Sequence, residues 1–304
     1  MTHSRKLFEF KDGFVDVPKG LHLIAGLTGF TDAGATLNQV ADHIFANLTA
    51  ELVVQFKNDD LLDYRSRRPV MFFERDHIEH YEPAILGLYL VYDEANQPFL
   101  YLHGYEPDFK WEAFAEAILD LVSGLEVEDF TWVHSIPFPI PHTRSVGVTV
   151  SGNRLDIIDA VSEWKPQTQV PGNVLHLLEY RLSGISLPTV GFVMLVPHYL
   201  SESEYPQAAV VAFEQISSAT GLVFPTDALR EDSVQFLAKL DSQLEKNEDL
   251  QKLVKNLEQG YATESSGPNR APIAKPIAKM PTAEEIAAEL EDYLAIRRRN
   301  SMDD

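Results

Sequence analysis

Hydrophobic side chains recur along the chain with two spacings, and each spacing predicts a type of secondary structure. Short apolar runs such as 21–27 (LHLIAGL) and 188–197 (PTVGFVMLVP) are typical of strands buried on both faces. Segments with apolar residues three and four apart, such as 35–48 and 111–121, predict amphipathic helices. Predicted strands and helices alternate over most of the chain, which indicates an α/β protein.

The order of these elements predicts the architecture. The glycine-rich loop and helix between the strands 21–27 and 51–56 match a βαβ unit, which implies parallel strands. The remaining strands are predicted at 70–73, 77–81, 86–92, 99–103, 130–135, 146–151 and 188–197. The remaining helices are predicted at 111–121 and 173–182, at 208–220, and as one or two helices within 227–259. Since the strands between 70 and 103 suggest an antiparallel excursion, we expect a three-layer αβα sandwich with a mixed sheet.

The composition changes near Tyr261 and predicts a domain boundary there. Residues 1–260 are predicted to form the αβα domain. Residues 261–281 contain four prolines and few side chains that could form a core, so they are predicted to be a linker. A capping-box motif at Thr282 precedes apolar residues spaced along one face, which predicts a C-terminal helix and tail at 282–304. We expect this helix to dock on the body or on a partner.

Composition and charge exclude several classes of function. The chain has 304 residues and no cysteine, which excludes thiol catalysis and thiolate metal sites. Lys and Arg total 25 against 46 Asp and Glu, and a net charge of −21 argues against nucleic acid or anionic membranes as partners. The polar start and the lack of an apolar run of about 18 residues predict a cytoplasmic protein without a membrane segment. No metal or cofactor is indicated.

The glycine-rich loop at 26–36 is a first candidate site because it lies between a predicted strand and a helix start. Backbone N–H groups at such a position can hold an anion, which would make Gly29, Asp32 and Gly34 ligand-contacting residues. The alternative is that the glycines form a tight turn and Asp32 caps the helix. The loop sequence leaves both interpretations open.

The proline-rich loop at 137–144 (PFPIPHTR) is a second candidate site. Its three prolines stiffen the backbone. His142 could transfer protons near neutral pH, and Arg144 could grip a carboxylate or phosphate with its forked guanidinium. The alternative is a rigid connector whose arginine pairs with one of the many acidic residues. Because each loop follows a predicted strand, we expect the two loops to share one edge of the sheet.

Two further groups of polar residues are candidates. Arg65, Arg67 and Arg68 follow a short acidic segment at 59–63, which indicates either a solvated ion-pair network or a subunit interface. Of these arginines, Arg65 and Arg68 are the predicted interface residues. His198 follows the apolar strand 188–197, where open α/β sheets bind ligands, although a single histidine there can also be structural.

Five segments in this order resemble the actinobacterial branch of the proteasome assembly chaperone 2 family. The segments are GFTDAG (29–34), DYRSRRP (63–69), EPDFKWEAF (106–114), PIPHTR (139–144) and VPHYL (196–200). The resemblance covers about residues 8–260 and implies a phosphorylase/hydrolase-like αβα fold, related in shape to purine nucleoside phosphorylases. It also implies a function in assembly, because eukaryotic relatives are chaperones that pair with a partner and hold proteasome α-rings.

Two functional hypotheses follow. The first is a non-enzymatic assembly or scaffold protein that forms a homo-oligomer, with a trimer as the working assumption, and contacts a protein partner. The second is a small-molecule enzyme or binding protein of nucleoside-phosphorylase-like fold that uses Asp32, Arg144 and His198. We favour the first hypothesis because the motifs include no ordered catalytic set. A pocket in which Asp32, Arg144 and His198 converge would favour the second.

Overall fold

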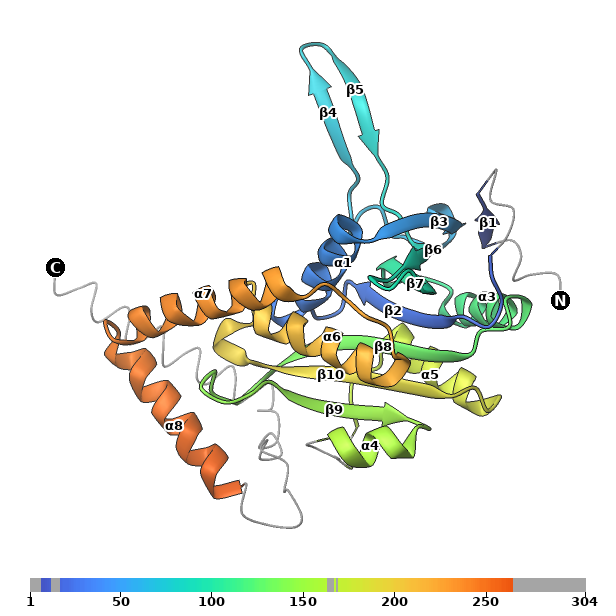
Figure 1. The fold of residues 1–304 in the computed structure, drawn as a ribbon. Helices are drawn as coiled ribbons and strands as arrows, with labels where there is room; N and C mark the ends of the chain where they lie inside the picture. Colours follow the sequence, from blue (N-terminus) through green and yellow to red (C-terminus); the bar gives the residue numbers. More distant parts are fainter. Residues whose placement is uncertain (1–6, 12–16, 163–166, 168, 265–304) are drawn as a thin grey trace, which may run out of the picture.

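An eight-stranded sheet runs through the computed structural model, which describes residues 7–11, 17–162, 167 and 169–264 (Figure 1). The strands lie in the order β1-β3-β6-β7-β2-β8-β10-β9. Their bounds are β1 (Phe8–Phe10), β2 (His22–Thr28), β3 (Thr49–Phe56), β6 (Gly87–Tyr92), β7 (Pro98–Tyr105), β8 (Asp129–Phe138), β9 (Gly147–Gly152) and β10 (Thr189–Pro197). Every strand except the three-residue β1 was predicted from the hydrophobic pattern.

The sheet is mixed, as predicted. Strands β7, β2, β8 and β10 are parallel neighbours at its centre. Strands β1, β3 and β6 on one side and β9 on the other make antiparallel pairs. Strands β2 and β3 run in the same direction, as the βαβ order predicted, but the β6–β7 hairpin lies between them. Strand order depends on long-range pairing, which the local pattern does not encode.

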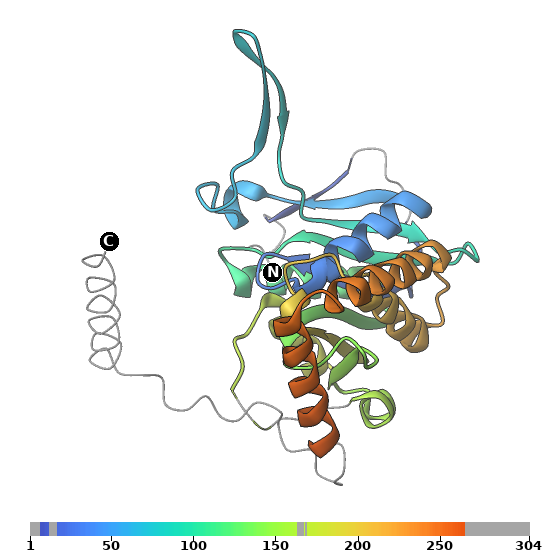
Figure 2. The same cartoon turned by 90° about the vertical axis from the view of Figure 1, so that its left-hand side faces the viewer.

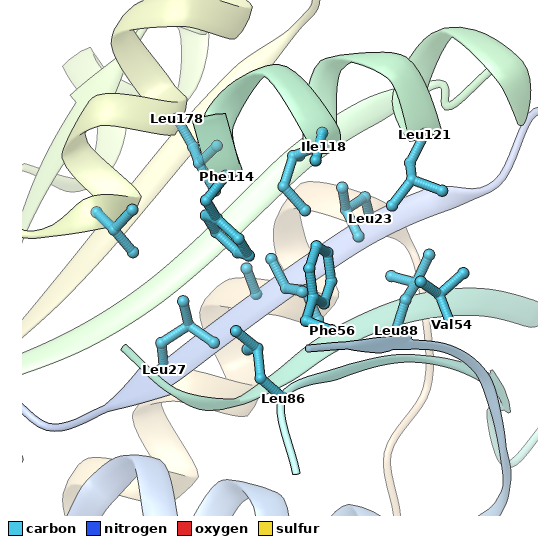
Figure 3. Close-up of a cluster of buried hydrophobic side chains, with 14 of the residues drawn as sticks. Leu23, Leu27, Val54, Phe56, Leu86, Leu88, Phe114, Ile118, Leu121 and Leu178 are labelled. Atoms are coloured by element: carbon cyan, nitrogen blue, oxygen red, sulfur yellow. The ribbon is translucent and has the colours of Figure 1, made fainter. Parts of the chain in front are cut away.

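Two helices cover each face of the sheet, so the predicted three-layer αβα sandwich is confirmed. The helices α1 (Thr36–Asn47) and α6 (Pro206–Thr220) pack on one face, and α3 (Trp111–Gly124) and α5 (Val174–Gly184) pack on the other. Figure 3 shows the second interface, where Phe114 and Ile118 of α3 and Leu178 of α5 point toward Leu23 and Phe56 of the sheet. All five side chains are buried, and such burial supplies most of the favourable free energy of folding.

A tight contact joins the two central strands β8 and β10. The indole of Trp132 lies against Gly191, where a Cβ would be 2.2 Å from the ring. The Trp132 Nε1 donates to Glu179 Oε2 at 2.8 Å, and the Ser151 hydroxyl donates to the same oxygen at 2.7 Å. Trp132 is thereby fixed between the sheet and α5, and only glycine leaves room for it at position 191.

Several short or terminal elements were not predicted in detail. Helices α7 (Asp227–Leu244) and α8 (Glu248–Glu264) form the predicted helical end, and α8 continues past the predicted boundary at 260. The rest of the predicted linker and the helix predicted within 282–304 lie outside the described residues. Additional short elements are η2 (Ala33–Ala35), α2 (Asn58–Leu61), α4 (Leu155–Val161) and η3 (His198–Leu200). None of the described helices is both long and apolar enough to cross a membrane.

The strands β4 (Val70–Glu74) and β5 (His77–Glu82) form a separate two-stranded sheet, the β4–β5 hairpin. Figures 1 and 2 show it extending away from the body, on the side opposite α8. Its large exposed hydrophobic side chains are Val70, Met71, Phe72, Phe73, Ile78 and Tyr81. In this hairpin the apolar strand residues are exposed rather than covered by a layer of helices.

Candidate functional site

The carboxylate of Asp32 occupies the start of α1. Its Oδ1 accepts a hydrogen bond from Leu37 N at 2.7 Å, and its Oδ2 accepts one from Asn38 N at 3.1 Å. The Ser135 hydroxyl also donates to Oδ1, at 3.3 Å. Burial raises the pKa of Asp32, while these backbone and side-chain donors act to lower it. Asp32 therefore satisfies the N–H groups that an external anion would use, as the capping interpretation predicted.

Gly34 joins the glycine-rich loop to the segment that follows β10. Its N–H donates to Ser201 O at 2.8 Å, and its carbonyl accepts from Tyr205 N at 2.9 Å. Gly34 has φ +69, and a Cβ at this position would lie 2.9 Å from the Cβ of Tyr205. The glycine thus permits a left-handed turn and a close approach between two loops.

Gly29 borders an arginine that was not among the predicted site residues. The side chains of the predicted Arg65 and Arg68 are exposed, whereas the Arg67 side chain is only 26% exposed. Arg67 Nη1 donates to Glu106 O at 2.7 Å, and Nη2 lies 3.2 Å from Asp108 Oδ1. The change from acidic to basic residues marked this segment, but it did not distinguish the half-buried Arg67 from the exposed Arg65 and Arg68.

A buried histidine, His134, also lies at this edge of the sheet and was not predicted as a site residue. Its Nε2 is 2.9 Å from the Thr31 hydroxyl, and the Phe30 ring stacks on it with 5.8 Å between centroids. Its Nδ1 is buried without a hydrogen-bond partner among the described residues. Burial, with a contribution from His176, lowers the pKa of His134 to about 4, so the ring is neutral at pH 7.

Helix α8 covers the proline-rich loop through Arg144. The Nε and Nη2 atoms of Arg144 donate to Glu258 Oε2 at 3.0 and 2.8 Å, and the Thr143 hydroxyl donates to Oε1 of the same carboxylate. The Arg144 guanidinium also lies 5.7 Å from the centroid of the Tyr261 ring. Thr143 and Arg144 lower the pKa of Glu258. This is the acid pairing that the connector interpretation predicted for Arg144.

Tyr199 brings two of the predicted histidines together. The Tyr199 hydroxyl accepts a hydrogen bond from His142 N at 2.8 Å and lies 2.6 Å from His142 Nδ1. The His198 ring meets the edge of Tyr199 with 5.5 Å between centroids. Among the surface cavities of the described residues, one lies at β1 and α2, one at β1 and the end of α3, and one at the end of α6. These three are not lined by Asp32, Arg144 or His198. Ligand and interface roles for the predicted residues stay predictions.

The described residues hold no group of three or more His, Asp or Glu side chains that is arranged to bind a metal ion. The β4–β5 hairpin offers a different kind of surface. Val70 and Phe73 are 68% and 61% exposed, and the cross-strand pairs Met71–Tyr81 and Phe73–Ile78 join apolar residues. Exposed apolar surface of this kind is typical of a protein-interaction site.

Comparison with known proteins relates the chain to one family. A family model described as the PAC2 family matches residues 26–244. A Corynebacterium glutamicum protein of unknown function is 34% identical, with a TM-score of 0.82 over 86% of this chain and 98% of that chain. A Mycobacterium tuberculosis protein of unknown function is 36% identical, with a TM-score of 0.79 over 84% of this chain and 91% of that chain.

A more distant structural likeness extends to a proteasome-assembly chaperone homologue of Mycobacterium tuberculosis. It is 19% identical, with a TM-score of 0.70 over 77% of this chain and 100% of that chain. At this identity the likeness shows a shared fold. No protein with curated annotation matches the chain.

Proposed function

The chain belongs to the PAC2 family, and we propose that it is a non-enzymatic assembly or scaffold protein that self-associates through the β4–β5 hairpin. The family match and the likeness to a proteasome-assembly chaperone homologue support a protein-interaction role. Proteasome components are therefore the first protein partners to test. The working assumption of three subunits and the cytoplasmic location stay predictions.

The exposed apolar side chains of the hairpin carry this proposal. A two-stranded hairpin is marginally stable in water by itself, and this one keeps Phe72 and Phe73 at 54% and 61% exposure. Burying one large apolar side chain contributes about 1.5–3 kcal/mol. Several such side chains on one hairpin therefore provide a substantial driving force for association.

A second copy of the chain is the proposed occupant of this surface. With a net charge of −21, two copies repel each other at a distance. Contact between copies therefore requires apolar burial that offsets this repulsion, and the hairpin, which extends from the body in Figure 2, carries exposed apolar side chains that can supply it. This argument favours self-association as the first role of the hairpin and leaves other surfaces for a protein partner.

Sedimentation velocity at micromolar concentration tests the proposal. We expect the wild-type protein to sediment as a species heavier than the 34.2 kDa chain. A variant with Phe72→Ser and Phe73→Ser should shift toward the monomer. The matched control combines Tyr180→Ser and Val234→Ser, two apolar residues of α5 and α7 that are 77% and 69% exposed. A monomeric wild type, or a hairpin variant as heavy as the wild type, would contradict the proposal.

The alternative function is a small-molecule enzyme or binding protein that uses Asp32, Arg144 and His198. It rests on the fold, which is a poor guide to activity. Asp32 and Arg144 already hold α1 and Glu258. Both side chains would have to leave these partners to bind a ligand, so we favour the scaffold function.

A further inference from the structure

We propose that Arg67 is the positioning residue that fixes the direction of the β4–β5 hairpin, and that its guanidinium meets the glycine-rich loop at Gly29. The inference assigns a role to Gly29, which the sequence had marked as a candidate ligand contact. It rests on the proposed function only where it concerns self-association. The orientation of the hairpin can be measured in a single chain.

The hairpin begins very close to Arg67. Only Arg68 and Pro69 separate Arg67 from Val70, the first residue of β4. Proline restricts its own φ and the conformation of the residue before it, so this connection has little freedom. A fixed position for Arg67 therefore limits the directions in which β4 can leave the body.

The Arg67 guanidinium binds the end of β7. Nη1 donates to Glu106 O at 2.7 Å, Nη2 lies 3.2 Å from Asp108 Oδ1, and the guanidinium carbon lies 5.6 Å from the centroid of the Tyr105 ring. Asp108 Oδ2 also accepts from Asp63 N at 2.8 Å. Asp108 thus holds both ends of the segment 63–67, and Arg67 joins that segment to the sheet.

The same guanidinium lies against the end of β2. Gly29 has φ +130, and a Cβ there would be 2.4 Å from Arg67 Nη2 and 2.9 Å from its Cζ. The ends of β2 and β7 are themselves joined, because Glu106 N donates to Thr28 O at 2.7 Å. Arg67 therefore spans two neighbouring parallel strands at their carboxyl ends.

Glu106 extends the connection to α5. Its Oε1 accepts from Val174 N at 2.7 Å, and burial raises its pKa. The root of the hairpin is thus linked to β2, β7 and α5. A planar guanidinium with several fixed donors suits this arrangement, whereas a lysine ammonium is a single point charge and cannot bond in the same fork.

The other leg of the hairpin is also attached, which makes Arg67 the complementary anchor. Asn58 Nδ2 donates to Ala84 O at 2.7 Å, and Leu86 O accepts from Phe56 N at 2.9 Å, just before β6. With both legs attached, the exposed apolar residues are presented in one direction. Such preorganisation reduces the entropy lost on association.

Distance measurement by double electron–electron resonance tests the inference. The chain has no cysteine, so two introduced cysteines can be labelled selectively. Asp76→Cys places a label at the hairpin turn, where the side chain is 89% exposed, and Ser123→Cys places an exposed label on α3. Labelled chains are diluted with excess unlabelled protein, so that only distances within one chain are observed.

We expect a narrow distance distribution in the labelled parent and a shifted or broadened one after Arg67→Ala, with Arg67→Lys giving the same direction of change. The matched control is Arg65→Ala, which removes a side chain that is 89% exposed and should leave the distribution narrow.

Unchanged distances in the Arg67→Lys variant would overturn the inference, even if Arg67→Ala fails to fold. In sedimentation, Arg67→Ala should weaken self-association roughly tenfold, and Arg65→Ala should not. If Phe72→Ser with Phe73→Ser leaves the mass unchanged but Arg67→Lys broadens the distances, the proposed function fails and this inference stands. If Phe72→Ser with Phe73→Ser gives a monomer but the distances in Arg67→Lys stay narrow, the proposed function stands and this inference fails.

Discussion

The molecule contains two sheets whose apolar residues have opposite surroundings. All nine residues of β10 are buried, between the strands β8 and β9 and beneath helices on both faces. All six residues of β5 are exposed, and β5 pairs only with β4 in the described structure. Both strands were predicted from the sequence, β10 from its continuous apolar run. Their difference shows that hydrophobicity predicts a strand, whereas burial depends on which elements cover it.

The difference also separates two contributions of apolar residues. In the eight-stranded sheet they stabilise the folded chain against unfolding. In the β4–β5 hairpin they pair across the two strands but stay exposed in the described structure, so they are available for contact with another molecule. Substitutions in the two sheets should therefore affect different measurements.

The largest expected effect on stability comes from Trp132→Ala. Trp132 is fully buried, and removing its indole leaves a cavity and takes one of two hydrogen-bond donors from Glu179, so the free energy of unfolding should fall by about 3–5 kcal/mol. Phe72→Ala, at a hairpin residue that is 54% exposed, should change it by less than about 0.5 kcal/mol. Denaturant unfolding at a concentration low enough to keep the chains monomeric measures both. Equal losses would contradict the contrast between the sheets.

A smaller effect is expected from pH, through the buried His134. The unfolded pKa of histidine is near 6.5 and burial lowers the folded pKa to about 4, so the unfolded state binds more protons between these values. The contribution of His134 to stability should therefore be lost as the pH falls from 6.5 to 4, by up to roughly 3 kcal/mol. Unfolding curves measured across this range should have a shallower pH dependence in His134→Gln.

The comparison with the hairpin supplies the control for this experiment. His80→Gln removes a histidine whose side chain is 63% exposed, and it should keep the wild-type slope. His22 acts in the opposite direction, because its hydrogen bond to Asp129 raises its pKa and stabilises the fold at low pH. Subtracting the curve of unfolding free energy against pH for His134→Gln from that of the wild type isolates the contribution of His134. An unchanged slope in His134→Gln would refute the prediction.

The smallest expected effect comes from adding one methyl group. Gly191→Ala places a Cβ 2.2 Å from the Trp132 indole, and overpacking should lower the free energy of unfolding by roughly 1–3 kcal/mol. Gly124→Ala, at the end of α3 with no atom within 4 Å of the new Cβ, should raise it by up to about 1 kcal/mol. Denaturation experiments on the two variants should therefore show that glycine-to-alanine substitution lowers the free energy of unfolding at position 191 and raises it at position 124. A Gly191→Ala protein as stable as wild type would show that the indole can move.

Much of the fold could be predicted because its signals are local. Continuous apolar runs located β2 and β10, and apolar residues three and four apart located α1 and α3, since a helical side chain repeats its direction about every fourth residue. The turn between β6 and β7 is also held by a local contact, because Asp93 Oδ1 accepts from Gln97 N at 2.7 Å. The three-residue β1 has too few side chains to establish a pattern, so it was missed.

The sites could be predicted only in part. The segments containing Gly29, Asp32, Arg67 and Arg144 were all marked by their composition. Whether Asp32 caps α1 or contacts a ligand stayed open until its two bonds to the start of α1 were known. Arg67 could not be separated from Arg65 and Arg68, because its partners lie at the end of β7, about 40 positions away in the sequence.

The sequence by itself determined the elements, the αβα layering and the acidic, cysteine-free character of this protein. These properties depend on residue type and on spacing within one element. Only the tertiary structure decided that β6 and β7 separate β2 from β3, that Gly191 admits Trp132, and that β4 and β5 remain uncovered. Each of these outcomes depends on contacts between residues that are distant in the sequence, and the free energy of such contacts is set by the packing of the whole chain.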